Sequence, residues 1–147
     1  MAKKTRATAS KKLSEVIVKG MQEKKATDIV VMDLREVKNA VADYFVICSG
    51  SSDKQLKAIA DSIDEEVFNE YQIIINTTPL GTFPDITECP PLPYHLFTKN
   101  HIAFDLIYNP AETEFLKRAS QYGATTQNGY DMLVLQAEKA WEIWNRK

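Results

Sequence analysis

The chain has 147 residues, enough for one domain of ordinary size or for two small pieces, and its 44% hydrophobic and 26% charged residues are typical of a folded soluble protein. No apolar run reaches the length of a membrane span, and no apolar segment of signal-peptide type follows the basic N-terminus. Together with a count of only two cysteines, Cys48 and Cys89, this excludes a secreted protein, a membrane protein and a disulfide-rich fold, so we expect a cytoplasmic protein.

The formal net charge of −2 is unevenly distributed along the chain. Residues 1–25 carry eight Lys or Arg against two Glu, whereas residues 26–70 carry four against ten Asp or Glu. We predict that residues 1–9 form a basic, flexible tail. From Ser10 onward the spacing of apolar residues predicts an amphipathic helix, its apolar face made of Leu13, Val16, Ile17, Gly20 and Met21.

Two apolar runs then predict buried strands, at residues 28–34 and 44–48. Ser52, with Gln55 three residues later, is typical of a capping box and predicts the start of a second helix. One face of that helix is apolar and carries Leu56, Ile59, Ala60, Ile63 and Val67.

The second half begins with a short predicted strand at residues 73–75, followed by a proline-rich loop over residues 79–93. Residues 101–108 predict another strand. Asn109 and Pro110 are suited to the start of a helix that ends at Gly123. A short strand at 125–127 and a last helix complete the pattern; the apolar face of that helix carries Leu133, Ala137, Ala140, Trp141 and Trp144.

Strands that alternate with helices predict an α/β fold, a two-layer or three-layer sandwich with a mixed to mostly parallel sheet flanked by helices. We expect the strands of the second half to extend the sheet begun by the first, so that residues 10–70 and 71–147 pack as one α/β domain.

Residues 10–69 resemble the ribosomal silencing factor (Iojap-like) family. The most specific part of the resemblance is the string ADYFVICSGSS at residues 42–52, followed by Gln55 and by residues 58–60. The resemblance implies a protein without catalytic activity that binds a protein on the inter-subunit face of the large ribosomal subunit. It would repress translation by hindering attachment of the small subunit.

From about Tyr71 the chain instead resembles the C-terminal part of shikimate dehydrogenase. The residues that carry this resemblance are INTTPLG at 75–81, PPLPY at 90–94, FDLIYNP at 104–110, Glu112 and Thr113, and NGYDMLVLQ at 128–136. The chain therefore looks like a hybrid with its seam near residues 70–72.

The dehydrogenase resemblance implies that Asn76, Thr77, Thr78, Leu106 and Gly129 line a nicotinamide cofactor site, with Tyr108 and Gln136 facing shikimate. We expect these to be vestigial. The five glycines show no G-x-G-x-x-G spacing to bind a dinucleotide, and the Lys–Asp pair that the family uses in catalysis has no counterpart here. We therefore predict a non-enzyme with no cofactor, and NADP only if the dehydrogenase-like half still binds it.

In the first half, Lys3, Lys4, Arg6, Lys11 and Lys12 form the basic start of the chain. They either solubilise it or contact ribosomal RNA by counterion release, the reading we favour. Asp43, directly before a predicted strand, is either a turn residue or a carboxylate that faces a partner. With Tyr44, Lys11 and Lys12 it makes up our predicted partner-binding set.

Other candidates have ordinary structural explanations. His95 and His101 lack further metal ligands at suitable spacing, and Cys48 lies within an apolar strand. Residues 49–52 are better suited to a helix cap than to binding phosphate. Trp141 and Trp144 are expected in a core rather than as a platform for stacked bases.

We predict a translational repressor that binds the large ribosomal subunit, through a ribosomal protein and nearby RNA. The alternatives are a non-catalytic shikimate dehydrogenase fragment that binds shikimate or NADP weakly, and a folded chimera with neither activity. A homodimer through exposed strand edges is also expected to be accessible.

Overall fold

The structure, a computed structural model, describes the backbone of residues 2–146 and the side chains of residues 8–146. It contains two compact units, Met1–Glu70 and Tyr71–Lys147. Each unit has its own sheet, two-stranded in the first and three-stranded in the second. The α/β fold class is confirmed. The described strands form two sheets, where we expected one.

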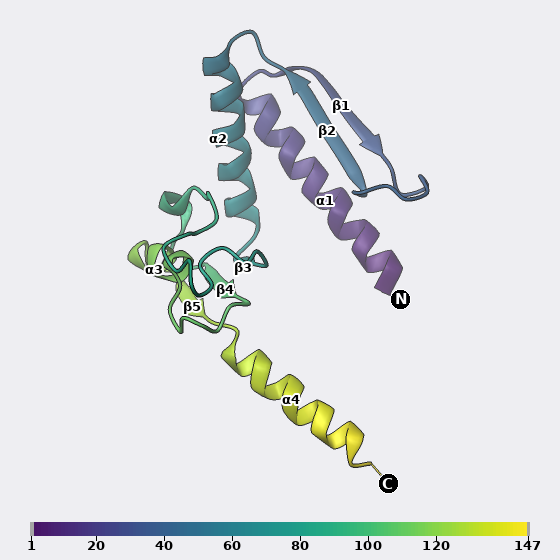
Figure 1. Cartoon of the computed structure of the whole chain (residues 1–147). Coiled ribbons are helices and arrows are strands. Elements are labelled where there is room, and N and C mark those ends of the chain that lie inside the picture. Colours follow the sequence, from purple (N-terminus) through teal and green to yellow (C-terminus); the bar gives the residue numbers. More distant parts are fainter. Residues whose placement is uncertain (1, 147) are drawn as a thin grey trace. The chain divides into compact units, whose positions relative to one another are not determined.

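The first unit runs α1 (Ala2–Glu23), β1 (Thr27–Asp33), β2 (Tyr44–Ser49) and α2 (Asp53–Glu70), with α1 lying along the hairpin and beside α2 (Figure 1). Helix α1 begins at Ala2, so residues 2–9 extend the helix where we expected a flexible tail. This segment contains neither glycine nor proline, and its Ala, Lys and Arg are good helix formers. The helix can therefore continue toward the N-terminus as far as Ala2.

Helices α1 and α2 approach closely at Gly20. A Cβ atom there would lie 2.7 Å from the Cα of Ile63 and 3.0 Å from the carbonyl oxygen of Ser62. The neighbouring Met21 is buried, as are Ile59 and Phe68 of α2. The absence of a side chain at Gly20 therefore allows the backbones to pack against each other and to bury one face of each helix.

The predicted capping box begins α2. Ser52 Oγ accepts a hydrogen bond from the backbone N–H of Gln55 at 3.2 Å, and Gln55 Oε1 accepts one from the backbone N–H of Ser51 at 2.6 Å. The first contact satisfies an N–H group that the first turn of the helix leaves unpaired, and the second binds the side chain of Gln55 to the residue before the cap.

Strands β1 and β2 pair antiparallel, with Val30 opposite Ile47 and Met32 opposite Phe45. These four side chains are all exposed, whereas the alternate β2 residues that face α1 are half-buried. Our prediction of two buried strands is wrong. Strand β2 alternates between half-buried and exposed residues, as expected where helices cover one face of a sheet, whereas β1 is exposed at six of its seven positions.

The second unit contains a parallel sheet of order β3-β4-β5, formed by β3 (Ile73–Asn76), β4 (Ile102–Asp105) and β5 (Thr125–Gln127). The other elements are the 3-10 turn η1 (Tyr94–Leu96) and the helices α3 (Glu114–Gln121) and α4 (Tyr130–Trp144). The parallel sheet predicted for this half is confirmed.

The core of the second unit is aromatic. The rings of Tyr94, Phe97 and Phe115 have centroids 5.9 to 6.3 Å apart, and they are buried together with Ala103 of β4 and Ala119 of α3. Such offset and edge-on pairs add to the free energy gained by burying their area.

Two predictions for this unit are wrong. Helix α3 begins after Thr113, whose side chain accepts a hydrogen bond from the N–H of Leu116, and not at Asn109. Thr113 is a favourable N-cap residue because its hydroxyl oxygen can accept from a free backbone N–H of the first turn, and residues 109–110 lie in the loop before it. Trp141 and Trp144, which we expected in a core, are 68% and 80% exposed, and no described residue of α4 is buried.

The contact at Gly20 generates a stability prediction. Gly20→Ala is expected to destabilise the first unit, because the overpacking cost of about 1–3 kcal/mol exceeds the gain of about 1 kcal/mol that alanine brings to a helix. Amide hydrogen exchange of α1 and α2 would measure the loss. Gly50→Ala is the control, since a Cβ there meets only the flexible side chains of Leu56 and Gln55. Equal protection in the two variants would contradict the prediction.

Candidate functional site

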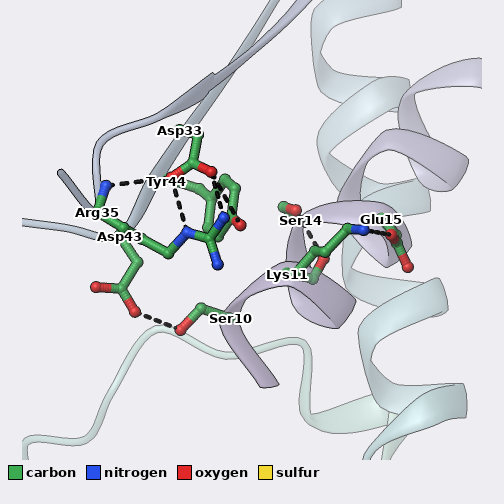
Figure 2. Close-up of polar contacts among 8 residues, drawn as sticks. All are labelled: Ser10, Lys11, Ser14, Glu15, Asp33, Arg35, Asp43 and Tyr44. Atoms are coloured by element: carbon green, nitrogen blue, oxygen red, sulfur yellow. Dashed lines mark hydrogen bonds and ion pairs between the residues drawn. The ribbon is translucent and has the colours of Figure 1, made fainter. Parts of the chain in front are cut away.

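The most strongly connected polar cluster on the first unit lies where the β1–β2 hairpin meets α1 (Figure 2). Arg35 donates from Nε to Asp33 Oδ1 at 2.8 Å and from Nη2 to Asp33 Oδ2 at 2.5 Å, a bidentate pair. The guanidinium carbon lies 5.1 Å from the ring centroid of Tyr44, whose hydroxyl donates to Asp33 at 3.5 Å. Because β1 ends at Asp33 and β2 begins at Tyr44, the hairpin register holds the two residues opposite each other.

The pKa values of Asp33, Arg35 and Tyr44 are shifted by their surroundings in this cluster. Hydrogen bonds from the Arg35 side chain, and then from its backbone N–H, lower the pKa of Asp33 to about 2. The same side-chain contact raises the pKa of Arg35, and burial raises the pKa of Tyr44. At neutral pH the cluster therefore presents a carboxylate, a guanidinium and a neutral phenol.

Asp43 lies next to this cluster. Ser10 of α1 donates a hydrogen bond to Asp43 Oδ2 at 2.6 Å, so the carboxylate joins the hairpin to the helix (Figure 2). Of the basic residues that we predicted, Lys11 pairs with Glu15 at 3.8 Å and Lys12 pairs with Glu70. Both lysines remain well exposed, at 64% and 59% of their side chains. The side chains of Lys3, Lys4 and Arg6 lie outside the described residues.

Two shallow grooves flank Tyr44 between α1 and the hairpin. One, of about 250 Å³, is lined by Ser10, Leu13, Ser14, Ile17, Ala42, Asp43, Tyr44 and Val46. The other, of about 330 Å³, is lined by Lys11, Ser14, Glu15, Val18, Val31 and Tyr44. The structure therefore brings Asp43, Tyr44 and Lys11 to one surface, which we call the α1–hairpin surface; Lys12 lies on the same helix and pairs with α2.

In the second unit Asn76 is 4% exposed and its amide is used within the protein. Its Nδ2 donates to Asp105 Oδ1 at 3.2 Å, and its Oδ1 accepts from the backbone N–H and the hydroxyl of Thr78. Asp105, fully buried, also accepts from the N–H of Ile107 and from Thr113 Oγ1. These contacts fix the carboxyl ends of β3 and β4.

The other residues implied in a nicotinamide site are arranged around the same strand ends. A Cβ atom on Gly129 would lie 2.1 Å from the carbonyl oxygen of Leu106, so the glycine is needed for packing. Thr77 and Thr78 are exposed, as are Tyr108 and Gln136, the latter on α4. Asn76 and Gly129 therefore both take part in packing the strand ends. A polar groove of about 340 Å³ lies nearby, lined by Ala111, Glu112, Leu116, Thr126, Gln127 and Asn128.

The remaining candidates lie apart from both regions. His101 is buried and its ring bonds to Thr98, whereas His95 is exposed in η1. Cys48 is half-buried with a free thiol. Within residues 2–146 no three His, Cys, Asp or Glu side chains gather as a metal site would require. The helices of the same residues include none that is long and apolar enough to span a membrane.

Comparison with known families decides the family of this chain. Residues 7–81, about half of the chain, match the family described as ribosomal silencing factor during starvation. The chain belongs to the ribosomal silencing factor family. The match contains the whole α1–hairpin surface and extends past Glu70 into β3 of the second unit.

The chain is also similar to shikimate dehydrogenases. It is 40% identical over 136 residues to a protein of Crocosphaera subtropica named shikimate dehydrogenase (NADP(+)). The aligned region covers 89% of this chain and 46% of that protein. It is 49% identical over 74 residues to an enzyme of Methanococcus maripaludis, covering 50% of this chain and 27% of that protein. The chain thus spans less than half the length of these curated relatives.

A crystal structure of shikimate dehydrogenase in complex with NADP+ superposes with a TM-score of 0.51 at 32% identity. The superposition covers 63% of this chain and 38% of that one. The enzyme of Listeria monocytogenes, at 23% identity and a TM-score of 0.53 over 67% of this chain and 40% of that one, shows the same fold. The hybrid resemblance inferred from the sequence is therefore confirmed.

Sequence reasoning missed Asp33 and Arg35. The two residues are only two positions apart at the end of a strand, a spacing that allows a bidentate pair across a turn. The spacing of Asp33 and Arg35 could have indicated their ion pair. The pairing of Asp33 with Tyr44 could not be predicted, because it depends on the register of the hairpin.

The depressed pKa of Asp33 can be tested by titration. Arg35→Gln is expected to return the Asp33 pKa from about 2 to near its ordinary value of 3.8. Because the folded-state pKa lies below the unfolded one, the pair contributes stability above pH 3.8 that is lost as the pH falls toward 2. Carboxyl carbon NMR shifts against pH measure this. Tyr44→Phe, which removes only the 3.5 Å contact, should move the midpoint far less.

The buried carboxylate of the second unit gives a further prediction. Asn76→Leu removes a donor from the fully buried Asp105, and such a loss costs about 1–3 kcal/mol of unfolding free energy. Urea denaturation followed by near-ultraviolet circular dichroism would measure it. Thr77→Leu, at the exposed neighbouring position, is the control and should change stability by less than about 0.5 kcal/mol.

Proposed function

We propose that the chain binds the large ribosomal subunit through its α1–hairpin surface and thereby hinders attachment of the small subunit. The observation that supports this most directly is the family match over residues 7–81, which contains every residue of that surface. The contacts would come from Asp43, Tyr44, Lys11 and Lys12. A chain that binds ribosomes in this way would act in the cytoplasm.

The chemistry of the surface suits a protein partner with adjacent RNA. Tyr44, stacked under Arg35, offers an aromatic face of restricted mobility, and such residues contribute strongly to protein interfaces. The grooves beside it accept side chains of a partner. Lys11 and Lys12 lie on α1, within residues 1–25, which carry a net positive charge. They would therefore add salt-dependent attraction to phosphates.

Repression by this route needs no chemical step. A folded body bound at the face where the two ribosomal subunits meet occupies volume that the small subunit needs. The effect then depends on occupancy alone, and so on the affinity of the α1–hairpin surface.

Co-sedimentation with purified large subunits, at low and at moderate salt, tests the proposal. The parent chain is expected to pellet at both and to reduce formation of joined ribosomes. Asp43→Lys is expected to weaken binding at least about tenfold, or about 1.4 kcal/mol, by reversing a charge beside Tyr44. Asp61→Lys on α2 makes the same charge change at an exposed site and serves as the control.

Asp43→Asn separates charge from structure, because the amide oxygen still accepts the hydrogen bond from Ser10. Binding at low salt only would mean non-specific contact with RNA. That result, or equal binding by Asp43→Lys and Asp61→Lys, would contradict the proposed surface.

A second candidate function follows from the dehydrogenase similarity: weak binding of shikimate or NADP without turnover. The favouring observation is 40% identity over 136 residues to a protein named for NADP(+). If the second unit binds either ligand, the chain should show a thermal shift that is lost in Tyr108→Ala or Gln136→Ala. No shift at millimolar ligand would remove this candidate.

A further inference from the structure

The groove of about 250 Å³ on the α1–hairpin surface combines one charge with an apolar wall. Among the described residues that line it, Asp43 alone is charged, and Leu13, Ile17 and Val46 form most of its apolar part. All of these residues belong to the first unit, so the groove is formed within that unit. It therefore offers a carboxylate directly beside apolar surface.

Two hydroxyl groups of this groove donate their protons within the protein. Ser10 Oγ donates to Asp43 Oδ2 at 2.6 Å, and Ser14 Oγ donates to the carbonyl oxygen of Lys11 at 2.7 Å (Figure 2). Since a hydroxyl has one proton and two lone pairs, both serines act toward a ligand as acceptors. They are four positions apart, so they lie on one face of α1 about one turn from each other.

The carboxylate adds to this set of acceptors. The two oxygens of Asp43 can together accept about four hydrogen bonds, so the bond from Ser10 is compatible with a bond from a ligand. The ligand group that suits the groove is therefore one that has several N–H donors and no acceptor of its own.

The charge around the groove favours a cation. Asp33 and Asp43 supply two carboxylates against the one guanidinium of Arg35, which binds both oxygens of Asp33. Lys11, at the neighbouring groove, pairs with Glu15. A phosphate would be repelled by this arrangement, whereas a cation would gain charge-assisted hydrogen bonds.

We propose that this groove binds the guanidinium of an arginine side chain presented by the protein partner on the large ribosomal subunit. The identity of the partner rests on the proposed function, whereas the chemistry of the bound group rests on the groove alone. A guanidinium has five N–H donors, no acceptor and a permanent charge. Its planar donors reach acceptors on separate residues, whereas the three donors of an ammonium share one atom. The methylene stem would lie along Leu13, Ile17 and Val46.

Titration of the full chain with n-butylguanidinium, followed by NMR shifts, tests the site without ribosomes. We expect saturable shifts at Asp43, Ser14 and Val46, with a Kd in the millimolar range that suits so small a ligand. n-Butylammonium is expected to bind about threefold more weakly, and uncharged n-pentanol at least about tenfold more weakly.

Variants separate the charge of the groove from its shape. Asp43→Asn should weaken binding of n-butylguanidinium at least about tenfold, because the amide oxygen still accepts from Ser10 but the charge is lost. Asp61→Asn, at an exposed position of α2, is the matched control and should leave binding unchanged. Ala42→Leu keeps the charge and should abolish binding, because the larger side chain fills the groove. Unchanged amide shifts away from the groove verify that each variant is folded.

Co-sedimentation with large ribosomal subunits tests the source of the guanidinium. Ala42→Leu should weaken subunit binding at least about tenfold, since a buried arginine contact is lost. Saturating n-butylguanidinium should compete with the subunits, and sodium chloride at the same concentration should compete less.

The two experiments can fail separately. The absence of saturable shifts with n-butylguanidinium, or equal binding by Asp43→Asn and Asp61→Asn, would overturn the guanidinium site. Binding of the probe together with unchanged subunit binding by Ala42→Leu would refute the arginine contact while ribosome binding stands. A parent chain that never pellets would refute the proposed function and, with it, the ribosomal source of the arginine, whatever the probe shows.

Discussion

The close approach of α1 and α2 at Gly20 is the contact on which the candidate site depends. With no side chain between the backbones, α1 is held against α2 on one side and against the inner face of β2 on the other. The N-terminal part of α1 then lies beside the loop that connects β1 to β2. Only in that position can Ser10 donate to Asp43.

The hairpin determines the rest of that surface. Its register places Asp33 opposite Tyr44, and the loop after β1 brings the guanidinium of Arg35 into contact with both side chains. Exposed ion pairs add little to stability because water screens them and both side chains lose entropy. The value of the Asp33–Arg35 pair is therefore in orientation, since it holds a charged group and an aromatic ring in fixed relation at a surface that a partner can contact.

Much of the fold could be predicted from the sequence, and the failures share a physical cause. Local patterns correctly gave the capping box at Ser52 and the parallel strands of the second unit. The apolar run at residues 28–34 was read as buried and the tryptophans of α4 as part of a core, yet β1 is exposed at most of its positions and no described residue of α4 is buried. Periodicity reports that a face is apolar, but whether it is covered depends on how many strands and helices surround it.

The candidate site was partly predictable for the same reason. Asp43 and Tyr44 came from a specific string of residues, whereas Asp33 and Arg35 acquire their relation to them only through strand pairing. A separation of 11 residues between Asp33 and Tyr44 gives no periodic signal. Side chains joined across a hairpin become visible only when the register is known.

The similarity to shikimate dehydrogenases concerns structure more directly than activity. Asn76 binds Asp105 and Thr78, and Gly129 leaves room for the backbone at Leu106, so both are required for the strand ends to pack as they do. Any chain with this arrangement needs such residues whether or not it binds a nucleotide. Fold can therefore remain recognisable at 32% identity while the chain spans 38% of the related enzyme. A function for this chain must therefore be argued from its surfaces, such as the α1–hairpin surface, and not from the fold alone.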